Sequence, residues 1–339
     1  MGRGNVYNQI TSPEKLALVN AENKQLVEDF IDYLASAKKS SATLYNYKAD
    51  LNIFFCWVLE NLDNKRFVEI TKRDIVRFQN HALNQWQWSS NRLRTVKAAV
   101  SSLGNFVENV LDDEYGGFRS IVNKVESPPK APVMEKTVWK QEELESLLGK
   151  LVESKKYMQA CYVALGMYSG RRKSELLRFK VSDFSDENLI AGGSLYRSSP
   201  IKTKGRGGGK YIRCYTLAKK FKPYFDMWMK ERQEQGIESE WLFPDYDTTQ
   251  PAKATRVDSW SASLSKIAGK PFYPHSMRHA FTTGLLEAGI PDSVITTIVG
   301  WESSDMVKVY DDREVDDQIS AYFENGEIAG KKPASFSDL

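Results

Sequence analysis

The chain has 339 residues, of which 41% are hydrophobic and 27% charged, and this composition excludes a disordered protein. Its length favours two domains over one. No apolar run approaches the roughly 18 residues of a membrane-spanning helix, and residues 1–15 lack the apolar core of a secretory signal. Cys56, Cys161 and Cys214 are too few and too scattered for a disulfide framework or a zinc site. We therefore expect a cytoplasmic protein.

The net charge is only +3, from 47 basic and 44 acidic residues. Acidic residues outnumber basic ones from Asp311 onward, so the preceding part of the chain is more basic than the whole. This distribution allows a polyanionic partner but does not establish one.

The first domain is predicted to be helical and to span residues 20–113, after a flexible stretch over 1–19. Apolar residues at three- and four-residue spacing predict one helix within 38–61: Leu44, Tyr47, Leu51, Phe54, Phe55 and Val58. Thr71 followed by Asp74 predicts a capping box at the start of another. A third helix follows Ser89 and Ser90, with one apolar face: Leu93, Val96, Val100, Leu103 and Val107. Such helices, joined by short polar segments, make a small bundle.

Cations also lie along these helices, and they form either a solvated face or a surface for nucleic acid: Lys38, Lys39, Lys48, Arg92, Arg94 and Lys97. Beyond them, residues 114–137 contain Gly116–Gly117 and three prolines, which interrupt helical periodicity. We interpret this stretch as a linker.

The second domain is predicted over residues 138–325, followed by a tail over 326–339. Helices are expected in 139–154, in 161–170 ending at Gly170, and in 219–235, 276–289 and 291–300. Alternating or β-branched residues in 187–204 and 210–217 flank a glycine-rich turn at 205–209 and predict a β-hairpin with a basic tip.

Four clusters in this domain carry chemistry. Arg171 and Arg172 open a helix, and Glu175, three residues after Arg172, can orient it or form an ordinary surface ion pair. The hairpin tip gathers cations that contact DNA, donate a proton or are merely solvated: Lys202, Lys204, Arg206, Lys210 and Arg213.

His275 and Arg278 stand three apart at a helix start, where both can address one ligand. A zinc site is not expected, because His275 and His279 lack a third ligand and have a cation between them. His279 is interpreted as structural. Trp301 can donate one hydrogen bond, and Tyr310, nine residues later, is a nucleophile once deprotonated, although single aromatic residues usually belong to a core or an interface.

The order of these clusters resembles the tyrosine recombinase (phage integrase) family. SGRRKSEL is similar to the family's first arginine box, which identifies Arg172, and HSMRHAF to its second, which identifies His275 and Arg278. VGWESSDMVKVY is similar to the tyrosine box, with Trp301 where many members have His and Cre recombinase has Trp, and with Tyr310 as the tyrosine. The Thr-Lys-Gly setting favours Lys204 as the hairpin lysine over Lys202 and Lys210.

The resemblance extends from about residue 20 to 325, because Ser40, Thr43, Tyr47, Leu51 and Phe54 match the family's core-binding domain. It implies an α-helical, SAM-like core-binding domain plus a mixed, mostly α, α/β catalytic domain with a small β-sheet or hairpin, closing as a C-shaped clamp on DNA. Arg171 departs from the pattern, since Leu or Met is commoner there; it alters the packing or adds a phosphate contact.

The implied activity is site-specific recombination or integration, through a 3′-phosphotyrosine and a Holliday junction, without ATP, metal or another cofactor. Arg172 and Arg278 would neutralise the phosphate, with hydrogen bonds from His275 and Trp301. Tyr310 would attack phosphorus, His275 would assist proton transfer at the tyrosine, and Lys204 would protonate the leaving oxygen. Glu175 and His279 would support the site.

The implied partners are double-stranded DNA with a specific recombination site, a homotetramer on paired sites and, as an open question, accessory DNA-bending proteins. Contacts to DNA are expected from Lys202, Arg206, Lys210, Lys48, Arg92, Arg94 and Lys97. Residues 315–325 are expected to form a helix that packs on a neighbouring protomer or on its own domain. The protein would act in a prokaryotic cytoplasm, at the nucleoid, or be encoded by a phage or mobile element, and no membrane is involved. A type IB topoisomerase and a catalytically silent DNA-binding protein of this fold are the alternatives.

Overall fold

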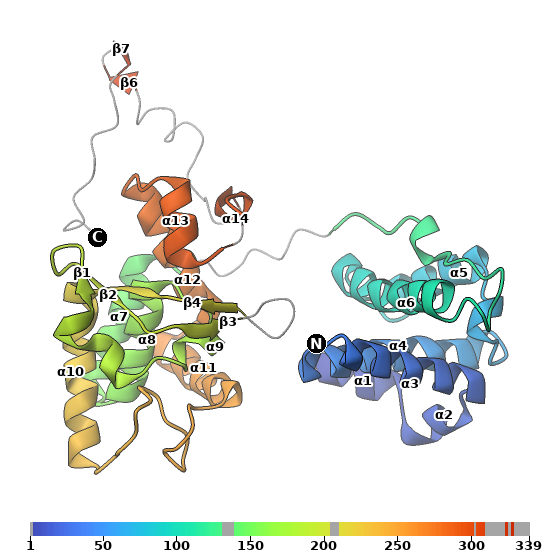
Figure 1. Cartoon of the computed structure of the whole chain (residues 1–339), viewed down its shortest axis with the longest axis horizontal. Coiled ribbons are helices and arrows are strands. Elements are labelled where there is room, and N and C mark those ends of the chain that lie inside the picture. The colour runs from blue at the N-terminus through green and yellow to red at the C-terminus, as the bar shows by residue number, and fades with distance from the viewer. Residues whose placement is uncertain are drawn as a thin grey trace. The chain divides into compact units, whose positions relative to one another are not determined.

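The computed structural model describes residues 3–130, 139–203, 210–301 and 303–308, together with two short strands at 323–324 and 327–328. The chain forms two compact units that divide between residues 130 and 139 (Figure 1). Each unit has its own hydrophobic core. None of the helices in the described ranges is long and apolar enough to cross a membrane.

In the described residues of the first unit, all regular secondary structure is helical. Its elements are α1 (Arg3–Ile10), α2 (Pro13–Leu18), α3 (Ala21–Ser36), α4 (Ser41–Asn61), η1 (Phe67–Glu69), α5 (Lys72–Asn84), α6 (Ser90–Val110) and η2 (Val122–Lys124). Helices α3, α4 and α6 pack against one another. Ser40 and Ser89 cap α4 and α6, and Thr71 and Asp74 form the predicted capping box of α5.

We expected residues 1–19 to be flexible, but the structure contains two helices in this segment. Residues 3–18 form α1 and α2, and Ile10 and Val19 are buried in the core of the first unit. Ser12 accepts a hydrogen bond from the Lys15 N–H and so caps α2, whose first residue is Pro13. Burial of these apolar side chains holds segments that are too short to show a helical period.

The expected linker over 114–137 also packs, in its first part, on the first unit. Val122 is 2% exposed within that unit's core, and Phe118 and Ile121 pack against it. The prolines that suggested a linker lie after this apolar segment, and residues 131–138 fall outside the described residues.

The second unit contains helices and short strands around one core (Figure 1). Its helices are α7 (Gln141–Glu153), α8 (Tyr157–Ser169), α9 (Lys173–Leu176), η3 (Val181–Phe184), η4 (Asp186–Asn188), α10 (Ala218–Glu234), α11 (Ala254–Ala268), α12 (Pro274–Glu287), α13 (Asp292–Val299) and α14 (Asp305–Lys308). Helix α8 packs against α7, α10 and α12, which explains why residues 160–169 are all buried. The mixed, mostly helical class predicted for this domain is confirmed.

Two antiparallel sheets accompany these helices. One has the order β1–β2–β5 and is formed by β1 (Leu189–Ile190), β2 (Leu195–Arg197) and β5 (Tyr215–Leu217). The other pairs β3 (Ile201–Thr203) with β4 (Lys210–Ile212), with Ile201 opposite Ile212 and Thr203 opposite Lys210. The predicted strand pairing is therefore present, and the glycine-rich turn lies outside the described residues.

The prediction of a helix over 315–325 is wrong for the last residues of that segment. Phe323–Glu324 forms β6, which pairs antiparallel with β7 (Glu327–Ile328). The rest of that segment lies outside the described residues. Helix α11 was not expected, although Val257, Trp260 and Leu264 follow helical spacing and are buried. The polar residues between them hide this period.

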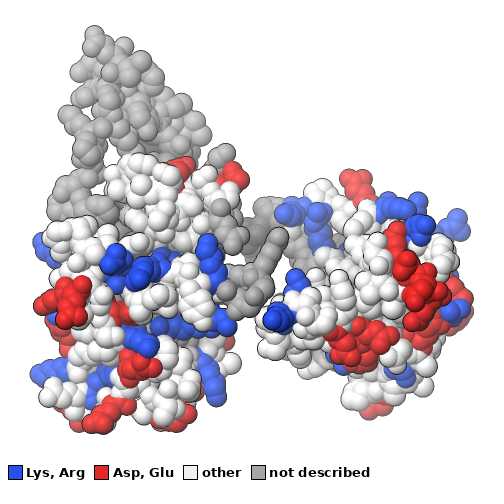
Figure 2. All heavy atoms as spheres, in the orientation of Figure 1, with Lys and Arg blue, Asp and Glu red and all other residues white. Residues whose placement is uncertain are grey.

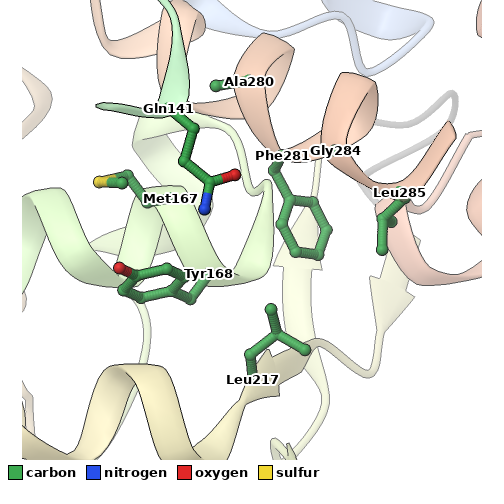
Figure 3. A pocket seen from close by; sticks show the side chains of 8 residues that line it. All are labelled: Gln141, Met167, Tyr168, Leu217, Ala280, Phe281, Gly284 and Leu285. Atoms are coloured by element: carbon green, nitrogen blue, oxygen red, sulfur yellow. The ribbon is translucent and has the colours of Figure 1, made fainter. Parts of the chain in front are cut away.

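The contact between α8 and α12 depends on two glycines. A Cβ at Gly166 would lie 2.4 Å from the Met277 sulfur, and one at Gly170 would lie 2.3 Å from the Phe281 ring. Gly170 ends α8 with φ +61°, a left-handed conformation that favours glycine. Figure 3 shows α8 and α12 side chains around a small, mostly apolar pocket at this contact, which belongs to the core.

Candidate active site

Residues 170–172 connect α8 to α9, and each of them contacts a different part of the second unit. The Gly170 carbonyl accepts a hydrogen bond from Arg278 Nη1 at 3.0 Å. The Arg171 side chain reaches the last carbonyls of α13. Arg172 binds Glu175. The first arginine box, which contains residues 170–172, is thus in direct contact with Arg278 of the second.

Arg172 is held by the buried carboxylate of Glu175. The Arg172 N–H donates to Glu175 Oε2 at 3.1 Å, and its Nη1 donates to Oε1 at 3.0 Å. The Thr203 hydroxyl, at the end of β3, donates to the same Oε1. The Arg172 side chain itself remains 38% exposed. Glu175 therefore fixes one edge of the guanidinium and leaves the side chain partly accessible.

Glu175 is ionised at neutral pH. Burial raises the pKa of its carboxyl group, but hydrogen bonds from Thr203 and Arg172 and the charge of Arg172 outweigh burial and hold the pKa below its usual value of 4.5. An ionised Glu175 accepts from all three donors at once, so it joins the N-terminus of α9 to the end of β3.

Arg278 lies between the end of α8 and Trp301. Its side chain is fully buried, and its Cζ is 5.2 Å from the centre of the Trp301 ring. Trp301 is 8% exposed and follows Gly300, which ends α13. His275 is exposed in the first turn of α12, and His279, one turn after it, is buried. The structure thus brings together Arg172, Arg278 and Trp301 around residues 170–172, with His275 on the same helix as Arg278.

Three expected site residues, Lys204, Arg206 and Tyr310, lie outside the described residues. Of the remaining hairpin lysines, Lys202 is exposed on the opposite face of β3 from Thr203, and Lys210 is exposed opposite Thr203 on β4. In the described ranges there is no group of three His, Cys, Asp or Glu residues that could hold a metal ion.

Lys97 is wrongly placed among the expected DNA contacts. It is only 5% exposed, and its Nζ donates to the Gln79 side chain and to the Val125 carbonyl, the latter at 2.8 Å. Burial, aided by the nearby charge of Arg94, lowers the pKa of Lys97. The ammonium group joins α6 to α5 and to the segment after η2, and it is not available to a phosphate.

The other expected contacts on the first unit are nearer the surface. Lys48 is partly exposed and pairs with Glu28 at 2.7 Å. Arg92 Nη1 donates to Asp50 at 2.7 Å, and Arg94 Nη1 donates to the Pro128 carbonyl at 2.8 Å. Figure 2 shows basic side chains spread over the visible faces of both units, with acidic ones between them.

Sequence reasoning did not predict the contacts of Thr203 with Glu175 or of Arg171 with the end of α13. In the sequence, Thr203 was used only to identify Lys204 as the hairpin lysine. Its hydroxyl could also have indicated a hydrogen bond to a carboxylate such as that of Glu175. Arg171 is fully buried in the free protein and hydrogen-bonds to the last carbonyls of α13, which supports the alternative of altered packing.

For the DNA cleavage that the resemblance implies, we expect Glu175→Gln to slow the reaction by about 10- to 100-fold at saturating DNA, because the neutral amide has one acceptor oxygen and faces Arg172 or Thr203 with its NH2. DNA affinity should change little. The stabilisation by ionised Glu175 is fully present above about pH 4.5 and declines as the pH falls toward the lowered pKa of the folded state. Single-turnover cleavage and unfolding measured against pH test this.

Asp183→Asn is the matched control. Asp183 is also a buried carboxylate of the second unit, and it accepts from the N–H groups of Lys180 and Ser199 at 2.8 and 2.7 Å. It does not contact Arg172, so its replacement should lower stability without slowing cleavage by folded protein. Equal cleavage defects in the two variants would mean that Glu175 acts through stability alone.

Similar proteins are known in several organisms. A SPbeta prophage-derived recombinase-like protein, YomM of Bacillus subtilis, is 29% identical over 316 residues, which cover 90% of this chain and 92% of that protein. The tyrosine recombinase XerA of Pyrococcus horikoshii is 22% identical over 291 residues, covering 85% of this chain and 89% of XerA.

Solved structures share the fold. XerH recombinase in a post-cleavage complex with a palindromic difH substrate has a TM-score of 0.62 at 18% identity, covering 95% of each chain. A lambda integrase tetramer bound to a Holliday junction has a TM-score of 0.62 at 16% identity, covering 86% of this chain and 79% of the integrase.

Family matches cover both units. Residues 26–117 match the N-terminal SAM-like domain of phage integrases, and residues 137–316, more than half of the chain, match the phage integrase family itself. The resemblance inferred from the arginine and tyrosine boxes is thereby confirmed: the chain belongs to the phage integrase family, the tyrosine recombinases.

Proposed function

We propose that this tyrosine recombinase cuts and rejoins duplex DNA at a specific recombination site, with Tyr310 as the nucleophile. The observation that carries the proposal is the meeting of Arg172, Arg278 and Trp301 around residues 170–172. Two guanidinium groups and an indole N–H suit a phosphodiester, whose nonbridging oxygens gain charge in the transition state.

The chemical step follows from these residue types. The Tyr310 oxygen bonds to phosphorus as its proton passes to a base, for which His275 is the candidate, and the bond from phosphorus to the 5′ oxygen breaks. Lys204 gives a proton to that oxygen, which leaves as a 5′-hydroxyl. Rejoining reverses these steps, and the phosphotyrosine bond keeps the energy of the broken one, so no nucleotide or metal cofactor is required.

Arg278 is fully buried in the free protein, whereas the Arg172 side chain is 38% exposed. A phosphate can therefore reach Arg172 first, and contact with Arg278 requires the atoms that cover it to move when DNA binds. This difference makes Arg172 the first phosphate contact.

DNA affinity would come mainly from phosphate contacts on each of the two units. The first unit offers the partly exposed Lys48, which pairs with Glu28, and a hollow lined by Thr43, Asn46, Arg94 and Lys130. The hairpin residues Lys202, Arg206 and Lys210 would add contacts from the second unit.

We extend the proposal to a homotetramer on two paired sites, acting in a prokaryotic cytoplasm on DNA of the host, a phage or a mobile element. Support comes from relatives: lambda integrase forms a tetramer on a Holliday junction, and YomM derives from a prophage. Residues 315–325 are the proposed contact between protomers.

The test uses purified full-length protein and nicked suicide substrates that tile the DNA flanking its gene. We expect a covalent protein–DNA adduct at one sequence, and sedimentation of a tetramer on paired copies of that site. Relaxation of supercoiled plasmid by a monomer, without site preference, would favour a type IB topoisomerase. Binding without adduct at any tiled site would favour a catalytically silent protein, and adduct formation only with added DNA-bending protein would identify an accessory factor.

A further inference from the structure

Arg171 is a buried cation whose hydrogen bonds go to main-chain carbonyls. Its exposed fraction is 0%, its Nη1 donates to the Val299 carbonyl at 3.2 Å, and its Nη2 donates to the Ile298 carbonyl. Burying a guanidinium group is costly unless it is hydrogen-bonded. These acceptors are the last carbonyls of α13, where the helix dipole is negative, so this position stabilises a cation.

The Arg171 guanidinium also lies against the turn that follows α13. Gly300 has φ +73°, and a Cβ at that residue would lie 2.6 Å from Arg171 Nη1. Both the helix end and the glycine turn therefore pack on one side chain. The next residue is Trp301, and its ring contacts Arg278.

The neighbours of Arg171 in the chain are tied to the site as well. Gly170 accepts from Arg278, and Arg172 binds Glu175. We propose that Arg171 is a positioning residue that fixes the end of α13, and with it Trp301, against Arg172 and Arg278. This inference rests on the proposed function only for the effect on cleavage, since the placement of Trp301 is measurable without it.

An apolar residue could not serve in this way. Leu has no donor for the carbonyls of Ile298 and Val299, and the buried Val299 carbonyl would remain unsatisfied. Lys keeps the charge and can bind one carbonyl, but it lacks the planar fork that reaches both. We therefore expect Arg at position 171 to hold the end of α13 best, Lys less well, and Leu least.

The test compares Arg171→Leu and Arg171→Lys with a matched control, Arg232→Leu. Arg232 is another buried arginine of the second unit, 5% exposed, and it donates to the carbonyls of Ser239, Trp241 and Leu242. Four properties are measured for each full-length variant: thermal unfolding, DNA affinity against salt, single-turnover cleavage at saturating DNA, and the 19F resonance of 5-fluorotryptophan at position 301, assigned with Trp301→Phe.

We expect both Leu variants to unfold at lower temperature. Arg171→Leu should also cleave at least about tenfold more slowly per folded molecule and shift the Trp301 resonance, because a small misplacement of a reacting site is costly. Its affinity and salt dependence should stay unchanged, and Arg171→Lys should be intermediate. Arg232→Leu should cleave at the wild-type rate with an unmoved resonance.

Two results would overturn the proposal: wild-type cleavage by folded Arg171→Leu, or an unmoved Trp301 resonance in that variant. A weaker affinity with a shallower salt dependence would also overturn it, since that result identifies a phosphate contact. If wild-type protein forms no adduct while Arg171→Leu still shifts the Trp301 resonance, the proposed function fails and the structural coupling stands.

Should Arg171→Leu fail to fold, Gly300→Ala and Gly269→Ala provide the comparison. Gly269 ends α11 with φ +76°, and nothing lies within 4 Å of a Cβ built there. Both variants meet the same backbone strain, but only Gly300→Ala displaces Arg171. We expect slower cleavage and a shifted Trp301 resonance in Gly300→Ala alone, and equal behaviour of the two variants would overturn the proposal.

Discussion

Replacing Tyr310 with Phe should abolish the covalent attachment of the protein to DNA while leaving DNA affinity unchanged. The substitution removes the oxygen that would attack phosphorus and keeps the ring, so the loss of cleavage should exceed about a thousandfold. A nicked suicide substrate traps the adduct of the wild-type protein, and a denaturing gel detects it.

Tyr273→Phe and Tyr211→Phe are the controls, because these tyrosines are exposed and lie near the site in sequence. Tyr273 is 57% exposed and precedes α12, and Tyr211 is 65% exposed on β4. Both variants should form the adduct normally. Tyr162 and Tyr168 are poor alternatives, since burial raises the pKa of each phenol. An adduct that persists in Tyr310→Phe and disappears in Tyr273→Phe would reassign the nucleophile.

Lys204→Ala should lose about 10²- to 10⁴-fold in the cleavage rate on ordinary DNA, the range expected for removal of a general acid. A 5′-bridging phosphorothiolate should restore most of this loss, because sulfur leaves without protonation. Thr203, which precedes Lys204, is bound to the Glu175 carboxylate that holds Arg172, so the chain enters the hairpin turn beside the candidate phosphate site.

Lys202→Ala and Lys210→Ala are the matched controls for Lys204→Ala. Lys202 is exposed on the face of β3 opposite Thr203, and its carbonyl accepts from Arg178. Both controls should show only modest, salt-dependent losses of affinity. Selective rescue of either control by the phosphorothiolate would shift the general acid to that lysine. Rescue of none of the three would assign proton donation to another residue.

Local sequence signals predicted the elements whose ends are chemically marked. The capping box of Thr71 and Asp74 predicted the start of α5, and Gly170 and Gly300 predicted the ends of α8 and α13. Helices α1 and α2 escaped prediction because they are short and are held by packing, which no local pattern reports.

Lys97 shows how charge can obscure a pattern. It follows Leu93 by four residues and precedes Val100 by three, so its position on α6 belongs to the buried face. Its charge suggested the surface, whereas the amide oxygen of Gln79 and the carbonyl of Val125 receive the ammonium group inside the unit. Both acceptors are distant in sequence, and no spacing rule identifies them.

The order of motifs identified Arg172, His275, Arg278 and Trp301 as a set, but it did not reveal how they are held. The Gly170 carbonyl is separated from Arg278 by 108 positions, and Glu175 from Thr203 by 28. Main-chain acceptors carry no signature in a sequence, and contacts over such separations arise only when the chain is folded.

The convergence on residues 170–172 affects how the site responds to thermal motion. If Arg172, Arg278 and Trp301 were connected only through a succession of intermediate contacts, the thermal displacement at each contact would add to the variation in the distances between them. Here Glu175 with β3, Arg278, and the end of α13 are each attached directly to one tripeptide. We therefore expect a displacement of the tripeptide to carry all three together, so that their mutual distances change less than their common position.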